Sequence, residues 1–277
     1  MIKVFVDTAS SIKYDEAKKY DIELIPLRYT MGEKEYEDGI DLTIDEFYKL
    51  LIEKKYFPKT SLPNLGKLEE RINAATANGD DVIILVLSSK LSGTYNSIKM
   101  LFEDNKKVHV VDSLLAVGGM RILVEEINKY RDRPVDEIIK HVEDLIPRVK
   151  ILAIPETLNY LAKGGRLSKK EWLIGSSLHI KPIITFKDGY VKTDAKKIGL
   201  KTAMKYIATE MTRLVDTNYT IVPSYTYNDK NLRNLINMVD SSYQKSMCDF
   251  DNLDPVLACH WGPNAFGFIF VKKDNAD

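Results

Sequence analysis

The segment with the clearest chemical potential follows the most apolar run of the chain. Residues 82–87 are all apolar, and Ser88, Ser92 and Gly93 come soon after them. Residues at helical spacing follow from Tyr95 onward. This order indicates a buried strand, a hydroxyl-rich loop and a helix, and the free N–H groups at the start of a helix favour an anion. Ser92 also has a simpler interpretation, because it could serve only as the N-cap of that helix.

His260 is the second residue that could do chemistry. It stands in the segment 259–264, whose glycine and proline predict a turn of specified backbone shape. Together with Ser92 it suggests a serine hydrolase or acyl-transfer enzyme, which is our alternative hypothesis. The strained turn of a hydrolase nucleophile needs glycine two residues before and after the serine, where this chain has Lys90 and Thr94. We therefore favour binding over catalysis and predict no catalytic residue.

Metals and nucleotide cofactors are not indicated by any motif. The four histidines lack the spacing of metal ligands, and Cys248 and Cys259 form no ligand pattern. The phosphate-binding patterns GxxxxGK[ST] and GxGxxG are absent from the sequence. We therefore predict neither a metal site nor a cofactor.

The elements that must position these residues fall into two groups. Strands predicted at 2–6, 82–87 and 108–111 each end in polar residues and precede a helix. Three such units predict a doubly wound, mostly parallel sheet, whose carboxyl edge gathers the polar loops. Residues 151–277 instead indicate an α+β domain with a hairpin turn at 187–190. We therefore expect an α/β protein of two domains, residues 1–150 and residues 151–277.

Hydroxyl residues also mark the predicted starts of helices. Thr43 and Glu46 have the spacing of a capping box, and Ser168 is expected to cap a helix that runs through residue 177. Thr60 and Ser61 lie between two prolines, which make the backbone there stiff and non-helical. Either of these two hydroxyls could cap the helix predicted at 65–77, or donate to a ligand.

Composition limits the class of protein. The chain has 277 residues, and its 40 basic and 40 acidic side chains cancel, which argues against a nucleic-acid surface spread over the whole protein. Two cysteines indicate a reducing compartment. No apolar run reaches the roughly 18 residues of a membrane span, and the chain opens on a strand-like segment rather than a signal peptide. We expect a cytoplasmic protein.

Four segments, taken together and in this order, resemble the DegV family of fatty-acid-binding proteins. They are residues 60–63, 91–97, 160–168 and 260–267, which read TSLP, LSGTYNS, YLAKGGRLS and HWGPNAFG. The segment at 180–183, before the predicted hairpin, fits the same family. The likeness spans nearly the whole chain.

The resemblance implies a non-catalytic carrier that holds one long-chain fatty acid, with the carboxylate between the two domains and the tail buried. Carried over by position, the carboxylate would be bound by Thr60 or Ser61, by Ser92 and the Gly93 backbone, and by His260 beside them. In several family members the loaded carrier is presented to an ATP-dependent kinase, which makes an acyl phosphate. We also expect a monomer that contacts membranes only transiently, to exchange lipid.

The resemblance assigns a second, more peripheral region. Arg166 would lie near the entrance or the partner surface. The family commonly has arginines beyond the hairpin, where Lys196 and Lys197 are the nearest cations in this chain. Lysine cannot form the two parallel hydrogen bonds that arginine makes with phosphate. The sequence therefore supports lipid binding more strongly than coupling to a kinase. Bulkier residues than usual, such as Trp261 and Phe266, are expected to shorten or reshape the pocket.

Physical chemistry is consistent with this assignment. A carboxylate leaves water only where several donors replace its hydration, and hydroxyls, helix-start N–H groups and a protonated His260 would form such a set. The tail would supply affinity, because about 0.8 kcal/mol per buried methylene gives a sixteen-carbon chain on the order of 10 kcal/mol before costs.

Overall fold

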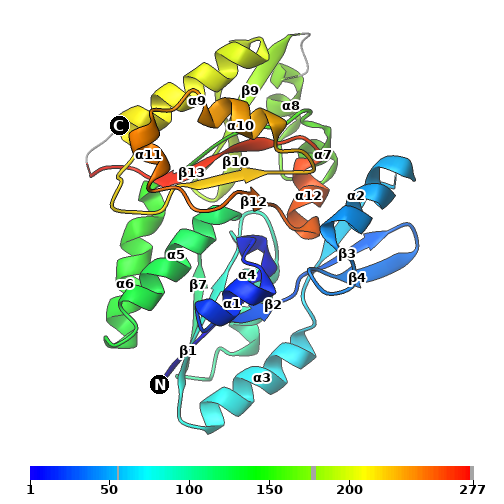
Figure 1. The fold of residues 1–277 in the computed structure, drawn as a ribbon. Coiled ribbons are helices and arrows are strands. Elements are labelled where there is room, and N and C mark those ends of the chain that lie inside the picture. The colour runs from blue at the N-terminus through cyan, green and yellow to red at the C-terminus, as the bar shows by residue number, and fades with distance from the viewer. Residues whose placement is uncertain (55, 176–178, 275–277) are drawn as a thin grey trace. The chain divides into compact units, whose positions relative to one another are not determined.

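The computed structural model describes residues 1–54, 56–175 and 179–274. The chain divides into two compact units (Figure 1). The first contains Met1–Ile146 together with Asp254–Val256, and the second contains the rest of the chain from Pro147. The sequence placed the division after residue 150. The difference arises because β8 (Val149–Ile154) is an inner strand of the second unit's sheet.

The first unit is built on a four-stranded parallel sheet, as predicted. Its strand order is β2 (Glu23–Ile25), β1 (Ile2–Asp7), β6 (Asp81–Val86) and β7 (Val108–Asp112). The apolar run forms β6, whose residues 82–86 are buried. Because all four strands run the same way, the polar residues that end β1, β6 and β7 lie at one edge. We call this the carboxyl edge.

Helices lie between the strands of this sheet in the chain and also follow its last strand, β7. They are η1 (Thr8–Ser10), α1 (Tyr14–Lys19), α3 (Leu65–Ala77), α4 (Thr94–Leu101), α5 (Gly118–Lys129) and α6 (Val135–Leu145), followed by η2 (Ile146–Arg148). One hydrophobic core cluster combines sheet residues such as Phe5 and Ile84 with Ile72 of α3 and Ile98 of α4. The predicted helix at 65–77 has the expected bounds. Its cap is Asn64, whose Oδ1 accepts from the Lys67 N–H at 3.1 Å, so the expectation that Thr60 or Ser61 caps it is wrong.

A small antiparallel sheet also belongs to the first unit. It has the order β4 (Lys34–Glu37), β3 (Arg28–Met31) and β5 (Lys59–Ser61), and α2 (Ile44–Glu53) follows β4 in the chain. Thr43 and Glu46 form the predicted capping box at the start of α2. The segment with the two hydroxyls is therefore a strand, and the sequence did not predict its pairing.

The second unit carries a six-stranded mixed sheet, which confirms the α+β prediction. The strand order is β10 (Tyr190–Ile198), β9 (Ile180–Lys187), β8, β13 (Phe266–Val271), β11 (Val222–Tyr225) and β12 (Asp251–Asn252). α9 (Leu200–Leu214) and α10 (Lys230–Ile236) pack on one face of this sheet, around Phe268. Positive φ angles at Asp188 and Gly189 make the predicted hairpin turn.

Shorter helices complete this unit. They are α7 (Asn159–Lys163), α8 (Lys169–Gly175), α11 (Ser241–Gln244) and α12 (Pro255–Trp261), of which the first two residues of α12 belong to the first unit. Ser168 caps α8 as predicted, because its Oγ accepts from the Glu171 N–H at 3.2 Å. The predicted end of that helix at residue 177 lies outside the described residues.

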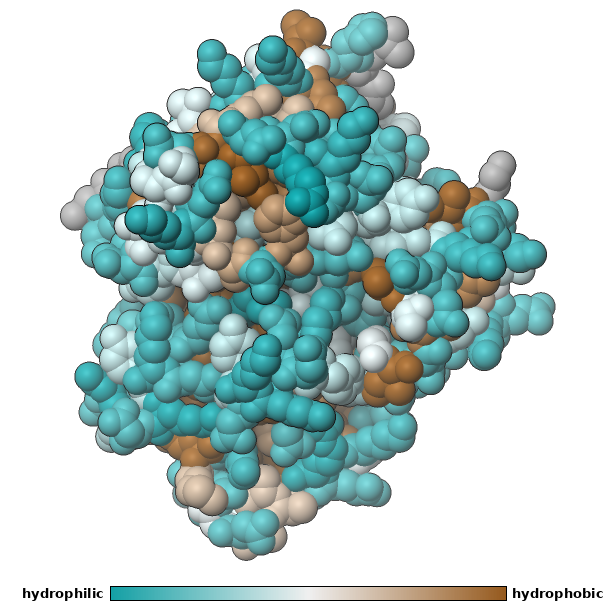
Figure 2. All heavy atoms as spheres, in the orientation of Figure 1, coloured by the Kyte–Doolittle hydropathy of each residue, from teal (hydrophilic) through white to brown (hydrophobic). Residues whose placement is uncertain are grey.

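The described surface is mainly polar. In Figure 2 the visible face is largely hydrophilic, with apolar side chains in small separate groups. Within the described ranges, no helix has both the length and the apolar character needed to cross a membrane.

Candidate functional site

Asp7 organises the carboxyl edge in the first unit. Its carboxyl group is fully buried, and its two oxygens accept from the Ala9 N–H at 3.0 Å and the Leu87 N–H at 2.8 Å. Asp7 therefore ties the loop after β1 to the loop after β6. Burial raises the pKa of Asp7 to about 7, although the two backbone hydrogen bonds oppose that shift.

The serine loop runs from Ser88 to the start of α4. Ser88 is buried, and its Oγ accepts from the Lys90 N–H at 3.2 Å, which fixes the loop internally. Ser92 is partly buried; its Oγ lies 2.9 Å from Thr94 Oγ1 and accepts from the Thr94 N–H at 3.3 Å. Gly93, not Ser92, is the N-cap residue of α4. The Ser92 hydroxyl thus lies at the start of α4, where the first N–H groups have no partner within the helix, and such a helix start is a suitable place for an anion.

Thr60 and Ser61 point to opposite faces of β5, because neighbouring residues of a strand alternate. The Ser61 Oγ contacts Glu35 Oε1 at 3.2 Å, and Glu35 also pairs with Arg28 at 2.8 Å. Thr60 lies opposite the buried Tyr29 in the sheet register. A fatty-acid carboxylate at Ser61 would meet the like charge of Glu35, so Thr60 has the more suitable surroundings.

The segment after β5 reaches the serine loop. A Cβ added to Gly93 would lie 3.9 Å from Leu62 Cδ2, which is ordinary contact distance. The Leu62 carbonyl is in turn held by the Arg28 side chain, whose Nε donates to it at 2.8 Å. The structure therefore brings the predicted residues of β5 and of the serine loop to the same part of the first unit.

His260 belongs to the second unit and lies in the last turn of α12. The expectation that it stands in a turn is wrong. Pro255 begins the helix, as proline commonly does, and Gly262 ends it with a φ of 68°. The glycine and proline that predicted a turn thus lie just beyond the histidine.

Two glycines allow close packing here, Gly164 against His260 and Gly262 against Tyr160. A Cβ added to Gly164, the C-cap of α7, would lie only 2.5 Å from His260 Nδ1. A Cβ added to Gly262 would lie 2.3 Å from Cδ2 of the Tyr160 ring. The glycine-rich segment after α7 and the end of α12 therefore interlock, and each contact has room only for glycine.

His260 and Arg166 share an electrostatic environment. Burial first, and the positive charge of Arg166 second, lower the pKa of His260 to about 3. Arg166 donates to the Gly164 carbonyl, and burial lowers its own pKa from the ordinary value. The expectation of a protonated His260 is therefore wrong at neutral pH. The neutral ring still offers one N–H donor, and Arg166 carries the nearby charge.

Thr226 is a residue that the sequence analysis missed. Its hydroxyl donates to the Gly262 carbonyl at 2.7 Å and accepts from the Ala265 N–H at 2.8 Å, and the side chain is fully buried. It therefore fixes the turn that follows His260. A buried threonine at the end of a strand has no local signature, because its partners lie far along the chain.

The sequence matches one protein family along almost its whole length. The model of a family described as "Uncharacterised protein, DegV family" matches residues 1–273. The chain belongs to the DegV family. A DegV domain-containing protein of Clostridium acetobutylicum is 31% identical to it over 284 residues, covering 98% of this chain and 99% of that one. The resemblance to the DegV family that the four sequence segments indicated is confirmed.

Two solved structures of the DegV family share the fold. A protein of Thermotoga maritima described as a DegV lipid binding protein has a TM-score of 0.83 and 26% identity, covering 98% of each chain. A second Thermotoga maritima protein, described as revealing fatty acid binding function, has a TM-score of 0.80 and 26% identity, covering 98% of this chain and 99% of that one.

The two lysines assigned on the DegV resemblance point to different faces of β10. Lys197 Nζ lies 4.3 Å from the centre of the Tyr206 ring on α9. Lys196 is its neighbour on the strand and is exposed. The structure therefore does not place both cations on one surface.

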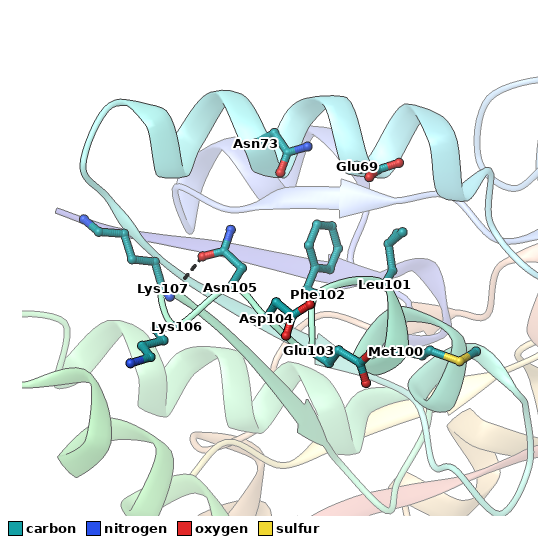
Figure 3. Close-up of a pocket in the computed structure, with 10 residues that line it drawn as sticks. All are labelled: Glu69, Asn73, Met100, Leu101, Phe102, Glu103, Asp104, Asn105, Lys106 and Lys107. Atoms are coloured by element: carbon teal, nitrogen blue, oxygen red, sulfur yellow. Dashed lines mark hydrogen bonds between the residues drawn. The ribbon is translucent and has the colours of Figure 1, made fainter.

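A surface cavity in the first unit is distinct from the serine loop (Figure 3). It has a volume of about 520 Å³ and lies between α3 and the turn that joins α4 to β7. This turn precedes β7, so the cavity lies toward the edge of the sheet opposite the carboxyl edge. Its lining carries three carboxylates, from Glu69, Glu103 and Asp104, and two lysines, Lys106 and Lys107, so we assign no fatty-acid head group to it.

Metal binding finds no support in the described part of the chain. Among residues 1–54, 56–175 and 179–274, the His, Cys, Asp and Glu side chains form no group of three or more that could hold a metal ion.

Proposed function

We propose that this DegV-family chain binds one long-chain fatty acid. Ser92 and the Gly93 backbone, with Thr60, hold the carboxylate from the first unit, and His260 donates to it from the second. The tail is buried in the interior. The observation that carries the proposal is the Ser92 hydroxyl at the start of α4, in a chain that is similar over 98% of its length to a protein described as revealing fatty acid binding function.

The donor set suits an anionic head group. A carboxylate gains most from several donors at once, and those of a helix start are already oriented. His260, neutral at pH 7, contributes an N–H without adding a charge that would itself need burial. Of the two adjacent hydroxyls we assign Thr60, because Ser61 lies against the Glu35 carboxylate.

The chain acts as a carrier rather than as an enzyme in this proposal. A loaded carrier can present the carboxylate to an ATP-dependent acyl kinase, with Arg166 near the entrance. Of the two lysines beyond the hairpin, the exposed Lys196 is proposed to contribute positive charge to the partner or phosphate region, whereas Lys197 lies against the Tyr206 ring. We further propose a cytoplasmic monomer that contacts a membrane only transiently, while lipid is exchanged.

Lipid extraction tests the proposal. Mass spectrometry of the purified chain under native conditions should show one co-purifying fatty acid per protein, released on denaturation. The competing hypothesis, an acyl-transfer enzyme or hydrolase, predicts turnover of a simple acyl ester that disappears in Ser92→Ala. Turnover of that kind, with no bound lipid and no affinity for added stearic acid, would overturn the carrier proposal.

A further inference from the structure

The start of α12 is held by a residue remote in sequence. Asp254 precedes the helix, Pro255 is its first residue, and the division into units assigns 254–256 to the first unit. Asp38, which follows β4, is fully buried, and its Oδ1 accepts from the Val256 N–H at 3.0 Å. Because Pro255 has no N–H, the Val256 N–H is the first donor of the helix, and Asp38 supplies its acceptor.

An ion pair completes this anchor. Lys13 Nζ lies 2.6 Å from Asp254 Oδ1, and Asp254 is only 8% exposed. The Lys13 backbone N–H is bonded to Glu16 at 3.0 Å, and Glu16 pairs with the buried Arg121. The first turn of α12 is therefore tied to α1 through Asp254 and to the end of β4 through Asp38.

Burying the Asp38 carboxyl group costs folding free energy, which argues that the position it gives to the start of α12 matters. Burial first, and repulsion by Asp254 second, raise the pKa of Asp38 well above its ordinary value. Hydrogen bonds from Thr8 and Val256 and the charge of Lys13 oppose that rise. An apolar residue at position 38 would avoid the cost of burying a carboxyl group but would leave the Val256 N–H without its acceptor.

The anchor and His260 lie on the same short helix. Val256 and His260 are four residues apart, so they share one face of α12 and are separated by about 6 Å along its axis. A helix of 7 residues has little stability of its own, and its position depends on the contacts at its ends. Loss of the acceptor at the first turn would therefore change where this helix holds the imidazole.

We propose that Asp38 is a positioning residue for His260, acting through the Val256 N–H at the start of α12. Asp38 makes no contact with the fatty acid in this assignment. The inference rests on the proposed function for its link to lipid affinity, but the position of the His260 ring can be measured without lipid.

The test combines two substitutions at Asp38 with a matched control. Asp38→Ala removes the acceptor, whereas Asp38→Asn keeps an oxygen for the Val256 N–H and removes the charge. Glu126→Gln is the control, because Glu126 is another buried carboxylate of the first unit. It lies on α5 and pairs with Lys129 of α5 and His141 of α6. NMR spectra of protein with ¹⁵N-labelled histidine, without lipid, report the His260 ring directly.

We expect Asp38→Ala to shift the His260 ring signals, and Asp38→Asn and Glu126→Gln to leave them close to the wild-type positions. In calorimetric titration with stearic acid, Asp38→Ala should weaken binding by up to roughly tenfold, the size expected for one lost hydrogen bond. In a His260→Ala background the same substitution should change affinity less than about twofold. A purely structural role would instead give additive losses.

Two outcomes would overturn the inference: unchanged His260 signals in a folded Asp38→Ala protein, or full additivity with His260→Ala. The affinity of His260→Ala for stearic acid tests the proposed function separately. If His260→Ala alone binds stearic acid as wild type does, the head-group assignment fails, while the ring signals still decide whether Asp38 positions His260.

Discussion

His260 illustrates how far burial changes a single side chain. The sequence predicted a protonated imidazole in a turn, and the structure has a neutral ring in the last turn of α12. The residue was found because glycine and proline follow it. Its protonation could not be predicted, because it depends on burial and on Arg166, a partner 94 residues away in the sequence whose proximity is a property of the fold.

Asp7 makes a pH-dependent prediction at the same scale. Its pKa is about 7 in the folded chain and near 3.8 when unfolded, so folding disfavours the charged form. The Asp7 contribution to stability is fully present below about pH 4 and is lost as the pH rises to 7. Chemical denaturation should show the free energy of unfolding of wild type falling, relative to Asp7→Asn, by up to about 4 kcal/mol between these limits.

Asp7→Asn itself is the control for that experiment, because asparagine keeps one acceptor and cannot ionise. Any constant cost of the substitution cancels when only the change with pH is compared. A difference between the two proteins that stays the same from pH 4 to pH 8 would show that Asp7 does not titrate as its burial predicts.

At the scale of elements, features encoded by neighbouring residues were predicted well. The individual strands β1, β6 and β7, the Thr43–Glu46 capping box, the Ser168 cap and the 187–190 hairpin all depend on residues close in sequence. The pairing of β5 with β3 and the placement of residues 254–256 with the first unit depend on distant segments, and the sequence did not predict them. The candidate site followed the same rule, since Asp38 and Thr226 act through remote partners.

The contact between the ends of α7 and α12 makes a prediction at this scale. Gly164→Ala places a methyl group 2.5 Å from His260 Nδ1, so we expect a loss of about 1–3 kcal/mol of unfolding free energy and weaker lipid binding. Gly66→Ala, inside α3, is the matched substitution: its Cβ has only Asn64 Oδ1 nearby, at 3.6 Å. It should stabilise the chain by up to about 1 kcal/mol.

Thermal denaturation and stearic acid titration of both alanine variants check the prediction. A Gly164→Ala protein with wild-type stability and wild-type affinity would mean that the α7 segment does not hold His260 in place.

At the scale of the whole molecule, each of the two units carries residues that we propose for the fatty-acid site. The first supplies hydroxyls and helix-start N–H groups at the carboxyl edge, and the second supplies His260 and Arg166. In a site for a polar head group with an apolar tail, a few oriented donors set the specificity. The buried tail supplies most of the affinity.

The affinity of Ser92→Ala/His260→Ala for stearic acid tests the central claim most directly. Hydrogen bonds to a charged group contribute about 1.5–3 kcal/mol each, so the double variant should bind at least about 100-fold more weakly than wild type, by calorimetric titration of delipidated protein. Binding should remain detectable because the tail contacts persist. Equal affinity of the two folded proteins would contradict the assignment of the carboxylate to these residues.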